Sequence, residues 1–415
     1  MNIVLSHPTG NANVKAVAMG LQDAEILSIF HTTIATFPEN AFGLLSAIPI
    51  FSELRRRSFD SKLQKNIKQW PWFEILRLVS TKAQFDNFTR HEKGYFSIDS
   101  VLRKFDKHVA DHLKSADFEG VTGIYAYEDA ALYSFQEAKL KNFKCLYDLP
   151  IGYWRSAQKL LIGEMERWPE WSSTLTGFAD SEAKLLRKDA ELQLADQIFV
   201  ASTFTAKTLS DFPGKLCPIE VIPYGFPPVV KNRKYTFFQN RRLKLLFVGG
   251  LSQRKGIADL FLAVDRFKNR VELTIVGQKS VANCNALNIA LSKHKWIPSL
   301  AHEDILAIML EHDVLIFPSL FEGFGLVITE AMSQGTPVIT TERTAGPDLI
   351  KHGENGWIIN AGSTEAISFA IENILSNPKS IGENGRSAIR TAESRPWHVY
   401  GEEVASSILN DRTRT

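Results

Sequence analysis

The sequence lacks the features that mark several classes of protein. Its 415 residues include only three cysteines, Cys145, Cys217 and Cys284, which are widely spaced and form no metal-binding or disulfide pattern. So few cysteines fit a reducing compartment. No run of about 18 apolar residues occurs, and the start, MNIVLSHPTG, has no basic segment followed by an apolar one. We therefore expect a cytoplasmic protein without a transmembrane helix or a signal peptide.

The chain also has little net charge, and it lacks two nucleotide-binding fingerprints. The formal charge is only +2, so we expect no nucleic-acid partner. Neither half of the chain has G-x-G-x-x-G after its first strand, and the P-loop pattern G-x-x-x-x-G-K-[ST] does not occur. The hydrophobic content of 44% and the charged content of 23% are those of a globular protein, and the length suffices for two domains.

Short apolar runs alternate with helical patterns in two successive series. The first series contains NIVLSH, VTGIYAY, FKCLYDLP and DQIFVAS, and the second contains KLLFVGG, VELTIVG, DVLIFPS and PVITT. Such alternation predicts βαβ units and parallel sheets. We predict an α/β protein with two Rossmann-like domains facing a central cleft, at residues 1–227 and 243–395. The basic, proline-containing stretch 228–242 is the predicted linker.

The loop FVGGLSQRKG is the first candidate site, because ligands of open α/β sheets bind beyond the carboxyl ends of the strands. It places Gly250, Arg254 and Lys255 between a strand and a helix. Backbone donors and two cations at one helix start suit a phosphate or diphosphate. The alternative is a glycine-rich turn with two solvated basic residues.

The stretch LFEGFGLVITEAMSQGTPVIT holds the second candidate, with a carboxylate on either side of a glycine-rich turn. The helix that begins near Leu326 would direct its N-terminal amides at a diphosphate. Glu330, one turn into that helix, can reach a vicinal diol such as a ribose, and Glu322 can accept bonds from the hydroxyls of a sugar. The alternative is a helix with an acidic residue near its start, which the helix dipole favours in any case.

The segment E-G-F-G-L-V-I-T-E resembles the signature of glycosyltransferase family 4, a retaining family with the GT-B fold. FVGGLSQRKG, VIPYGFP and AGPDLIKHGENGWII resemble other segments of that family in the same order. The likeness is dense from about residue 243 to 376 and loose before that. It implies an acceptor-binding domain at 1–227, a donor-binding domain at 243–395, and a final helix at 396–415 that crosses back to the first domain.

The resemblance also implies roles for the two loops. Glu330 would bind the ribose of a nucleotide, Glu322 the transferred sugar, and Lys255 the diphosphate. The family's partner arginine lies where this chain has Gly250, so we expect Arg254 to supply the second charge. The backbone groups implied at the same site are those of Phe324, Gly325 and Leu326.

A histidine that the family often has at the end of a strand in the first domain is missing. The matching strand, KCLYDLPIGYW, offers Asp148 as a catalytic candidate, and the preceding strand end offers Glu128 and Asp129. Each of these could instead cap a turn. The first loop faces the same cleft and adds three candidates for the acceptor or the diphosphate, unless it is only a turn: His7, Gly10 and Asn11.

The implied activity is the transfer of a sugar, with retention, from a nucleotide-diphosphate sugar to an acceptor hydroxyl in polysaccharide, glycolipid or glycoconjugate synthesis. We expect no metal ion and no other cofactor, because Arg254, Lys255 and the helix start at Leu326 supply positive potential for the leaving group. Two alternatives are a catalytically silent partner subunit and a nucleotide-cofactor oxidoreductase. The missing dinucleotide fingerprint counts against the oxidoreductase.

Residues 50–82 interrupt the alternation. The part FSELRRRSFDSKLQKNIKQWPWFEILRLVSTK has eight Lys or Arg against three acidic residues, with aromatic residues between them. One interpretation is a peripheral contact with anionic lipid, which would suit a lipid-linked acceptor as well as a glycan. The other is a solvated insertion that packs its Trp residues on the first domain.

Overall fold

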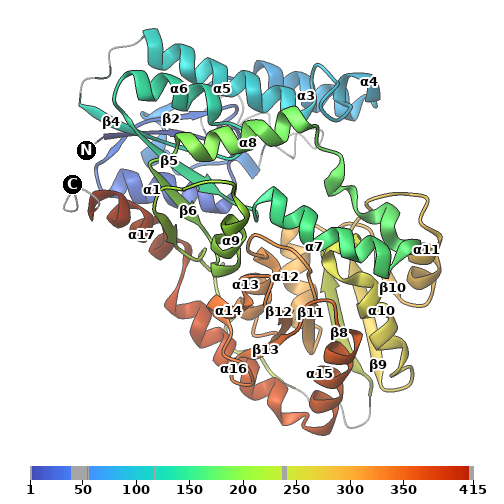
Figure 1. Cartoon of the computed structure of the whole chain (residues 1–415). Helices are drawn as coiled ribbons and strands as arrows, with labels where there is room; N and C mark the ends of the chain where they lie inside the picture. Colours follow the sequence, from blue (N-terminus) through green and yellow to red (C-terminus); the bar gives the residue numbers. More distant parts are fainter. Residues whose placement is uncertain are drawn as a thin grey trace.

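The protein folds into two α/β units, each built on a sheet of parallel strands. One unit lies above the other in Figure 1. The structure, a computed structural model, describes residues 2–38, 54, 56–115, 118, 120–235 and 241–410. Both predicted Rossmann-like sheets are present, so the predicted fold class is confirmed.

The first sheet has the strand order β3-β2-β1-β4-β5-β6-β7 in the described part of the chain, with parallel pairing throughout. Its inner strands are buried along almost their whole length, as expected for a parallel sheet covered on both faces. The strands are β1 (Asn2–Ser6), β2 (Leu27–Thr32), β3 (Ile67–Gln69), β4 (Val121–Tyr127), β5 (Lys144–Leu149), β6 (Gln197–Val200) and β7 (Ile219–Val221). The helices are α1 (Ala12–Asp23), α3 (Trp72–Lys82), α4 (Asp86–Thr89), α5 (Ile98–Ser115), α6 (Leu132–Leu140), α7 (Trp154–Arg167), α8 (Glu182–Leu194) and α9 (Thr203–Thr208).

The second sheet has the order β10-β9-β8-β11-β12-β13 and is parallel as well. Its strands are β8 (Leu243–Val248), β9 (Val271–Val276), β10 (Lys295–Ile297), β11 (Val314–Phe317), β12 (Val338–Thr341) and β13 (Gly356–Ile359). The helices are α10 (Ile257–Asp265), α11 (Asn285–Ser292), α12 (His302–Leu310), α13 (Leu326–Ser333), α14 (Gly346–Leu349), α15 (Thr364–Ser376) and α16 (Lys379–Ser394).

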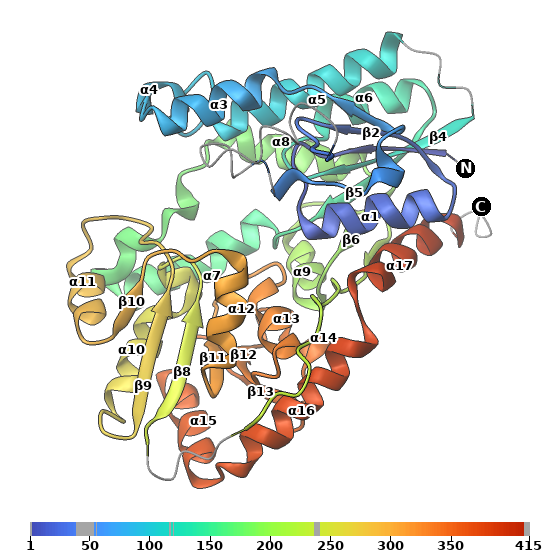
Figure 2. The same cartoon turned by 180° about the vertical axis from the view of Figure 1, so that it is seen from behind.

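The last helix, α17 (Trp397–Asn410), returns to the first unit and lies along α1 (Figure 2). The two helices meet through Gly20 and Gly401, since a Cβ atom at Gly20 would lie 2.1 Å from the carbonyl oxygen of Gly401. Glycines therefore allow a backbone approach that any side chain would prevent. The crossing helix predicted for 396–415 is present over its described residues.

Residues 50–82 contain more regular structure than the sequence suggested. Residues 50–53 and 55 lie outside the described residues. The remainder forms a short 3₁₀ turn, the edge strand β3 and helix α3. No helix among the described residues has both the length and the apolar composition to cross a membrane.

The segment 154–178 lies between β5 and α8 of the first unit in sequence, but it packs against the second unit. It comprises α7 and a 3₁₀ turn, η3 (Pro169–Thr174). Trp171 stacks on Phe261 of α10 with ring centroids 5.8 Å apart. Arg167 forms an ion pair with Asp259 of the same helix. This segment therefore ties the two sheets together before the linker is reached.

Candidate functional site

Adjacent strands of the second sheet bring the two predicted loops together. β8 pairs directly with β11, so the loops that follow their carboxyl ends leave the same edge of the sheet. The backbone N–H of Leu320 donates to the carbonyl of Arg254 at 2.8 Å, which fixes one loop against the other. The strand order therefore brings the two candidate loops together.

Lys255, Arg254 and Glu322 form a charged cluster between these loops. The ammonium of Lys255 bonds the Glu322 carboxylate, and the Arg254 guanidinium lies 3.3 Å from it. Burial opposes ionisation of Glu322, but the two cations outweigh this effect and hold its pKa below the usual value. Burial also lowers the pKa of Lys255, and Glu322 partly offsets that change. The cluster therefore holds two cations and one carboxylate together between the two loops.

Two glycines shape the turn that carries Glu322. Gly325 precedes α13 with φ of +90°, a conformation that side chains disfavour. A Cβ atom at Gly323 would lie 2.1 Å from the carbonyl oxygen of Pro150, at the end of β5. The hydroxyls of Ser202 and Thr205 donate to the Gly323 carbonyl. The turn is therefore held against the first unit, and its helix start leaves N–H groups at Gly325 and Leu326 for a ligand.

Glu330 lies one turn into α13, as predicted. Its carboxylate is 3.6 Å from the imidazole of His302 at the start of α12, and burial raises its pKa. Sequence reasoning missed His302, and no motif signals it, because the contact depends on how α12 packs beside α13. Gly250 is exposed, and a Cβ atom there would meet nothing within 4 Å. Phe324, by contrast, is buried against Tyr224, so only its backbone can serve a ligand.

The loop with Lys255 rests on the segment 154–178. The Ser252 hydroxyl donates to the Thr174 carbonyl at 2.7 Å, and the Gln253 N–H donates to the Thr174 hydroxyl at 2.9 Å. The Gln253 side chain also donates to Glu164 of α7 at 3.0 Å. These supporting contacts were not predicted, because they join residues some 80 positions apart.

Asp148 is placed in the core. It is 2% exposed and accepts a hydrogen bond of 2.7 Å from the Tyr125 hydroxyl. Burial raises the pKa of Asp148 to about 7, against the opposing hydrogen bonds of Tyr125 and Tyr400. Since Tyr400 belongs to α17, Asp148 takes part in joining the crossing helix to the first sheet. The partners of this catalytic candidate are thus tyrosines of the first sheet and of α17.

Glu128 and Asp129, at the end of β4, are both paired with α8. The Lys188 ammonium lies 3.4 Å from Glu128 and 3.6 Å from Asp129. Burial raises the pKa of Glu128 to about 7, although Lys188 counteracts it. The two carboxylates thus form an ion-pair network with Lys188 at the end of β4. The alternative prediction for them was that they cap a turn.

The first loop lines a cavity. His7 accepts from the N–H of Thr9 at 2.9 Å and lies edge-on to Tyr127, and burial lowers its pKa to about 4. The imidazole is therefore neutral near pH 7. Gly10 and Asn11 line a cavity of about 340 Å³, together with three arginines that sequence reasoning had not connected with this loop: Arg56, Arg57 and Arg77.

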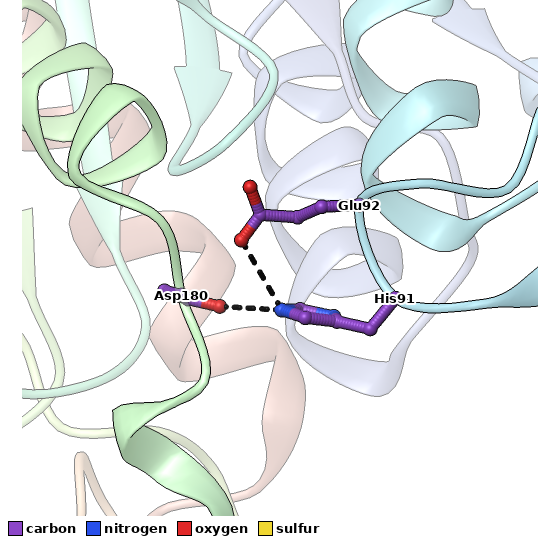
Figure 3. Close-up of side chains that lie close together, drawn as sticks. All are labelled: His91, Glu92 and Asp180. Carbon is purple, nitrogen blue, oxygen red and sulfur yellow. Dashed lines mark hydrogen bonds and ion pairs between the residues drawn. The ribbon is translucent and has the colours of Figure 1, made fainter.

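One group of side chains has the composition of a metal site in the described part of the chain: His91, Glu92 and Asp180 (Figure 3). The His91 Nε2 atom lies 2.9 Å from Asp180 and 3.3 Å from Glu92. Both carboxylates are already bonded, Asp180 by Lys184 and Glu92 by Ser181. The group links the turn after α4 to the start of α8. The expectation that no metal takes part in function stays a prediction.

Comparison with known proteins identifies the second unit. Residues 230–390 match the family model of glycosyl transferases group 1. The second unit therefore carries a group 1 glycosyl transferase domain. The expected kind of enzyme family is therefore confirmed, and the assignment to family 4 in particular stays a prediction.

Two curated relatives show how similar this chain is to known glycosyltransferases. The capsular polysaccharide biosynthesis glycosyltransferase CapM of Staphylococcus aureus is 27% identical over 261 residues, which cover 56% of this chain and 66% of the relative. An MMP α-(1→4)-mannosyltransferase of Mycolicibacterium hassiacum is 25% identical over 258 residues, 58% of this chain and 59% of the relative. The chain thus spans 66% of the length of the first relative and 59% of the length of the second.

Solved structures show the GT-B arrangement over the whole chain. A sucrose-phosphate synthase from Thermosynechococcus elongatus has a TM-score of 0.66 at 18% identity and covers 100% of both chains. Anabaena HepE in complex with UDP has a TM-score of 0.62 at 15% identity, over 99% of this chain and 100% of that one. At these identities the likeness concerns the fold, which agrees with the two sheets and the crossing helix.

Proposed function

We propose that this group 1 glycosyltransferase is active and moves a sugar from a nucleotide-diphosphate sugar to an acceptor hydroxyl, with retention and without a metal ion. The observation that carries the proposal is the cluster of Lys255, Arg254 and Glu322 at the start of two helices. The leaving diphosphate gains negative charge in the transition state. Cations that lie beside it are the principal means by which such a site lowers the activation barrier of the transfer.

The cluster suggests how the donor is received. A diphosphate would replace the Glu322 carboxylate as the partner of Lys255 and Arg254, and the N–H groups at Gly325 and Leu326 would bind further phosphate or sugar oxygens. Glu322, once released, would accept hydrogen bonds from sugar hydroxyls. Glu330 would bind the ribose, as the family resemblance implies. A likeness to HepE, solved with UDP, makes UDP the first nucleotide to test.

The first unit is proposed to bind the acceptor, a glycan or a lipid-linked glycan. Its first loop and the arginines Arg56, Arg57 and Arg77 line one cavity, and a buried carboxylate, Glu74, holds two of them in place. Guanidinium groups suit an acceptor that carries an anionic group. Contact of residues 50–82 with a membrane and a cytoplasmic location are further parts of this proposal, supported by the basic composition and the three free cysteines.

The proposal is tested by incubating the protein with UDP-, GDP-, ADP- and dTDP-sugars and measuring release of the nucleoside diphosphate, with and without EDTA. We expect release from the donors of one base, unchanged by EDTA, and strongly reduced in Glu322→Gln. Glu311→Gln, which changes an exposed carboxylate after α12, is the matched control. With an acceptor in hand, NMR of the product's anomeric configuration tests retention.

A silent partner subunit remains the second candidate, because the family histidine is missing and Gly250 replaces an arginine. It predicts that a nucleoside diphosphate binds while no donor sugar is turned over with any acceptor. Binding with turnover would exclude it.

A further inference from the structure

Exposed apolar side chains gather on one part of the first unit. Outside this part, the exposed large apolar residues of the described chain are spread over residues 140–369. Single exposed apolar residues are normal, whereas a concentration of them marks an interaction surface. The seven that lie between residues 72 and 98 are Trp72, Leu76, Val79, Phe85, Phe88, Tyr95 and Ile98.

Helix α3 supplies the regular part of this surface. Trp72, Leu76 and Val79 recur at intervals of four and three residues, so they share one face of the helix. They are 67%, 44% and 52% exposed. The other side of α3 carries Glu74, which is buried and bonded to Arg57 and Arg77. The apolar face therefore points outward because the polar face is anchored in the protein.

The remaining apolar side chains come from α4 and the start of α5. Phe85 and Phe88 contact each other edge-on, with centroids 6.3 Å apart. The Lys104 ammonium lies 3.2 Å from the centroid of the Tyr95 ring. The turn that carries these residues is tied to α8 through the His91 group of Figure 3. α3 and α4 lie along the upper edge of the first unit (Figures 1 and 2).

The same part of the chain carries many exposed cations and few exposed acids. Between residues 61 and 98, Asp86 is the one exposed acidic residue, whereas the exposed cations are Lys62, Lys65, Lys68, Lys82, Arg90 and Lys93. Such a surface complements negative charge. It would repel a second copy in a two-fold interface, since the same patch would face itself.

We propose that this apolar and basic surface, residues 61–98, docks on an anionic lipid bilayer. Aromatic and aliphatic side chains would enter the interface between headgroups and acyl chains, and Lys and Arg would bind anionic headgroups. The surface differs from the stretch 50–82, because it extends through α4 to the start of α5. It rests on the proposed membrane contact of residues 50–82 and deepens it, by naming the side chains and the kind of lipid that take part.

The test is sedimentation of the full chain with vesicles of phosphatidylcholine alone or with 30% phosphatidylglycerol (about one anionic lipid in three). We expect binding to the anionic vesicles that weakens with salt. The double variant Leu76→Ser, Val79→Ser should lose about tenfold or more in partitioning, since binding scales with buried apolar area. The variant Lys65→Glu, Lys93→Glu should lose the preference for anionic vesicles.

The matched control is Ile289→Ser, Phe369→Ser, which removes two exposed apolar side chains from the second unit and should bind as the wild type does. Circular dichroism establishes that each variant is folded, and UDP calorimetry in the Leu76, Val79 variant separates this surface from the donor site. Failure to bind anionic vesicles, or equal binding by the Leu76, Val79 variant, would overturn the proposal. So would wild-type self-association that this variant abolishes while its vesicle binding is unchanged.

Discussion

Replacing Lys255 by Met should weaken nucleoside-diphosphate binding much more than nucleoside binding. At about 4 Å and an effective dielectric constant of 20, two unit charges attract by about 4 kcal/mol. Lys255 already bonds Glu322, so the ligand replaces a partner and gains only part of this energy. We expect a loss of about 2–3 kcal/mol, or roughly 30- to 150-fold in Kd.

Isothermal calorimetry with the nucleoside diphosphate that binds the wild type, and with its nucleoside, measures this difference. The nucleoside Kd should stay within about twofold, since the proposed site assigns the diphosphate to Lys255 and the ribose to Glu330. Lys268→Met, at an exposed position after α10, is the matched control and should change neither value. An unchanged diphosphate Kd in Lys255→Met, or an equal loss for both ligands, would refute the reasoning.

Three further predictions concern the framework. Gly20→Ala should lower the free energy of unfolding by about 1–3 kcal/mol in urea denaturation, because its methyl group would collide with Gly401 of α17. Asp148→Ala should destabilise the protein by about 1–3 kcal/mol, because it removes the acceptor of the Tyr125 hydroxyl, and it should leave the donor Kd unchanged. Lost turnover at unchanged stability would instead make Asp148 catalytic. Burial lowers the pKa of His31 from 6.5 to about 3, so between these values the unfolded chain binds the extra proton. Wild type should therefore lose stability relative to His31→Gln as pH falls through that window, by about 1.4 kcal/mol per pH unit, and a parallel pH dependence of the two would contradict this.

The parts of the fold that the sequence predicted are those set by local pattern. Strands such as VLIFPS and KLLFVGG are recognisable because a parallel sheet buries both faces, and glycine turns mark their ends. The sequence predicted that both loops follow strands, whereas the pairing of β8 with β11, which brings Lys255 to Glu322, came only with the structure. The start of α13 at Leu326 likewise follows from Gly325, whose positive φ precedes the helix.

The parts that could not be predicted depend on distant contacts. Nothing in the segment 154–178 signals that Trp171 stacks on Phe261, because that contact requires both sheets to be in place. The core position of Asp148 depends on Tyr400, some 250 residues later. The exposed face of α3 has the spacing of an ordinary amphipathic helix, and only the buried Glu74 on its other side shows which face is turned outward.

The central claim is that the loop from Glu322 to Glu330 binds the nucleotide of a sugar donor, and calorimetry with Glu330→Ala tests it most directly. UDP, GDP, ADP, dTDP and NAD would be titrated into the wild type and the variant. We predict that one nucleoside diphosphate binds the wild type, that NAD does not, and that the variant loses about tenfold or more in affinity, as expected when a buried acceptor of ribose hydroxyls is removed. A folded wild type that binds none of the four diphosphates, or a variant that binds as well as the wild type, would contradict the claim.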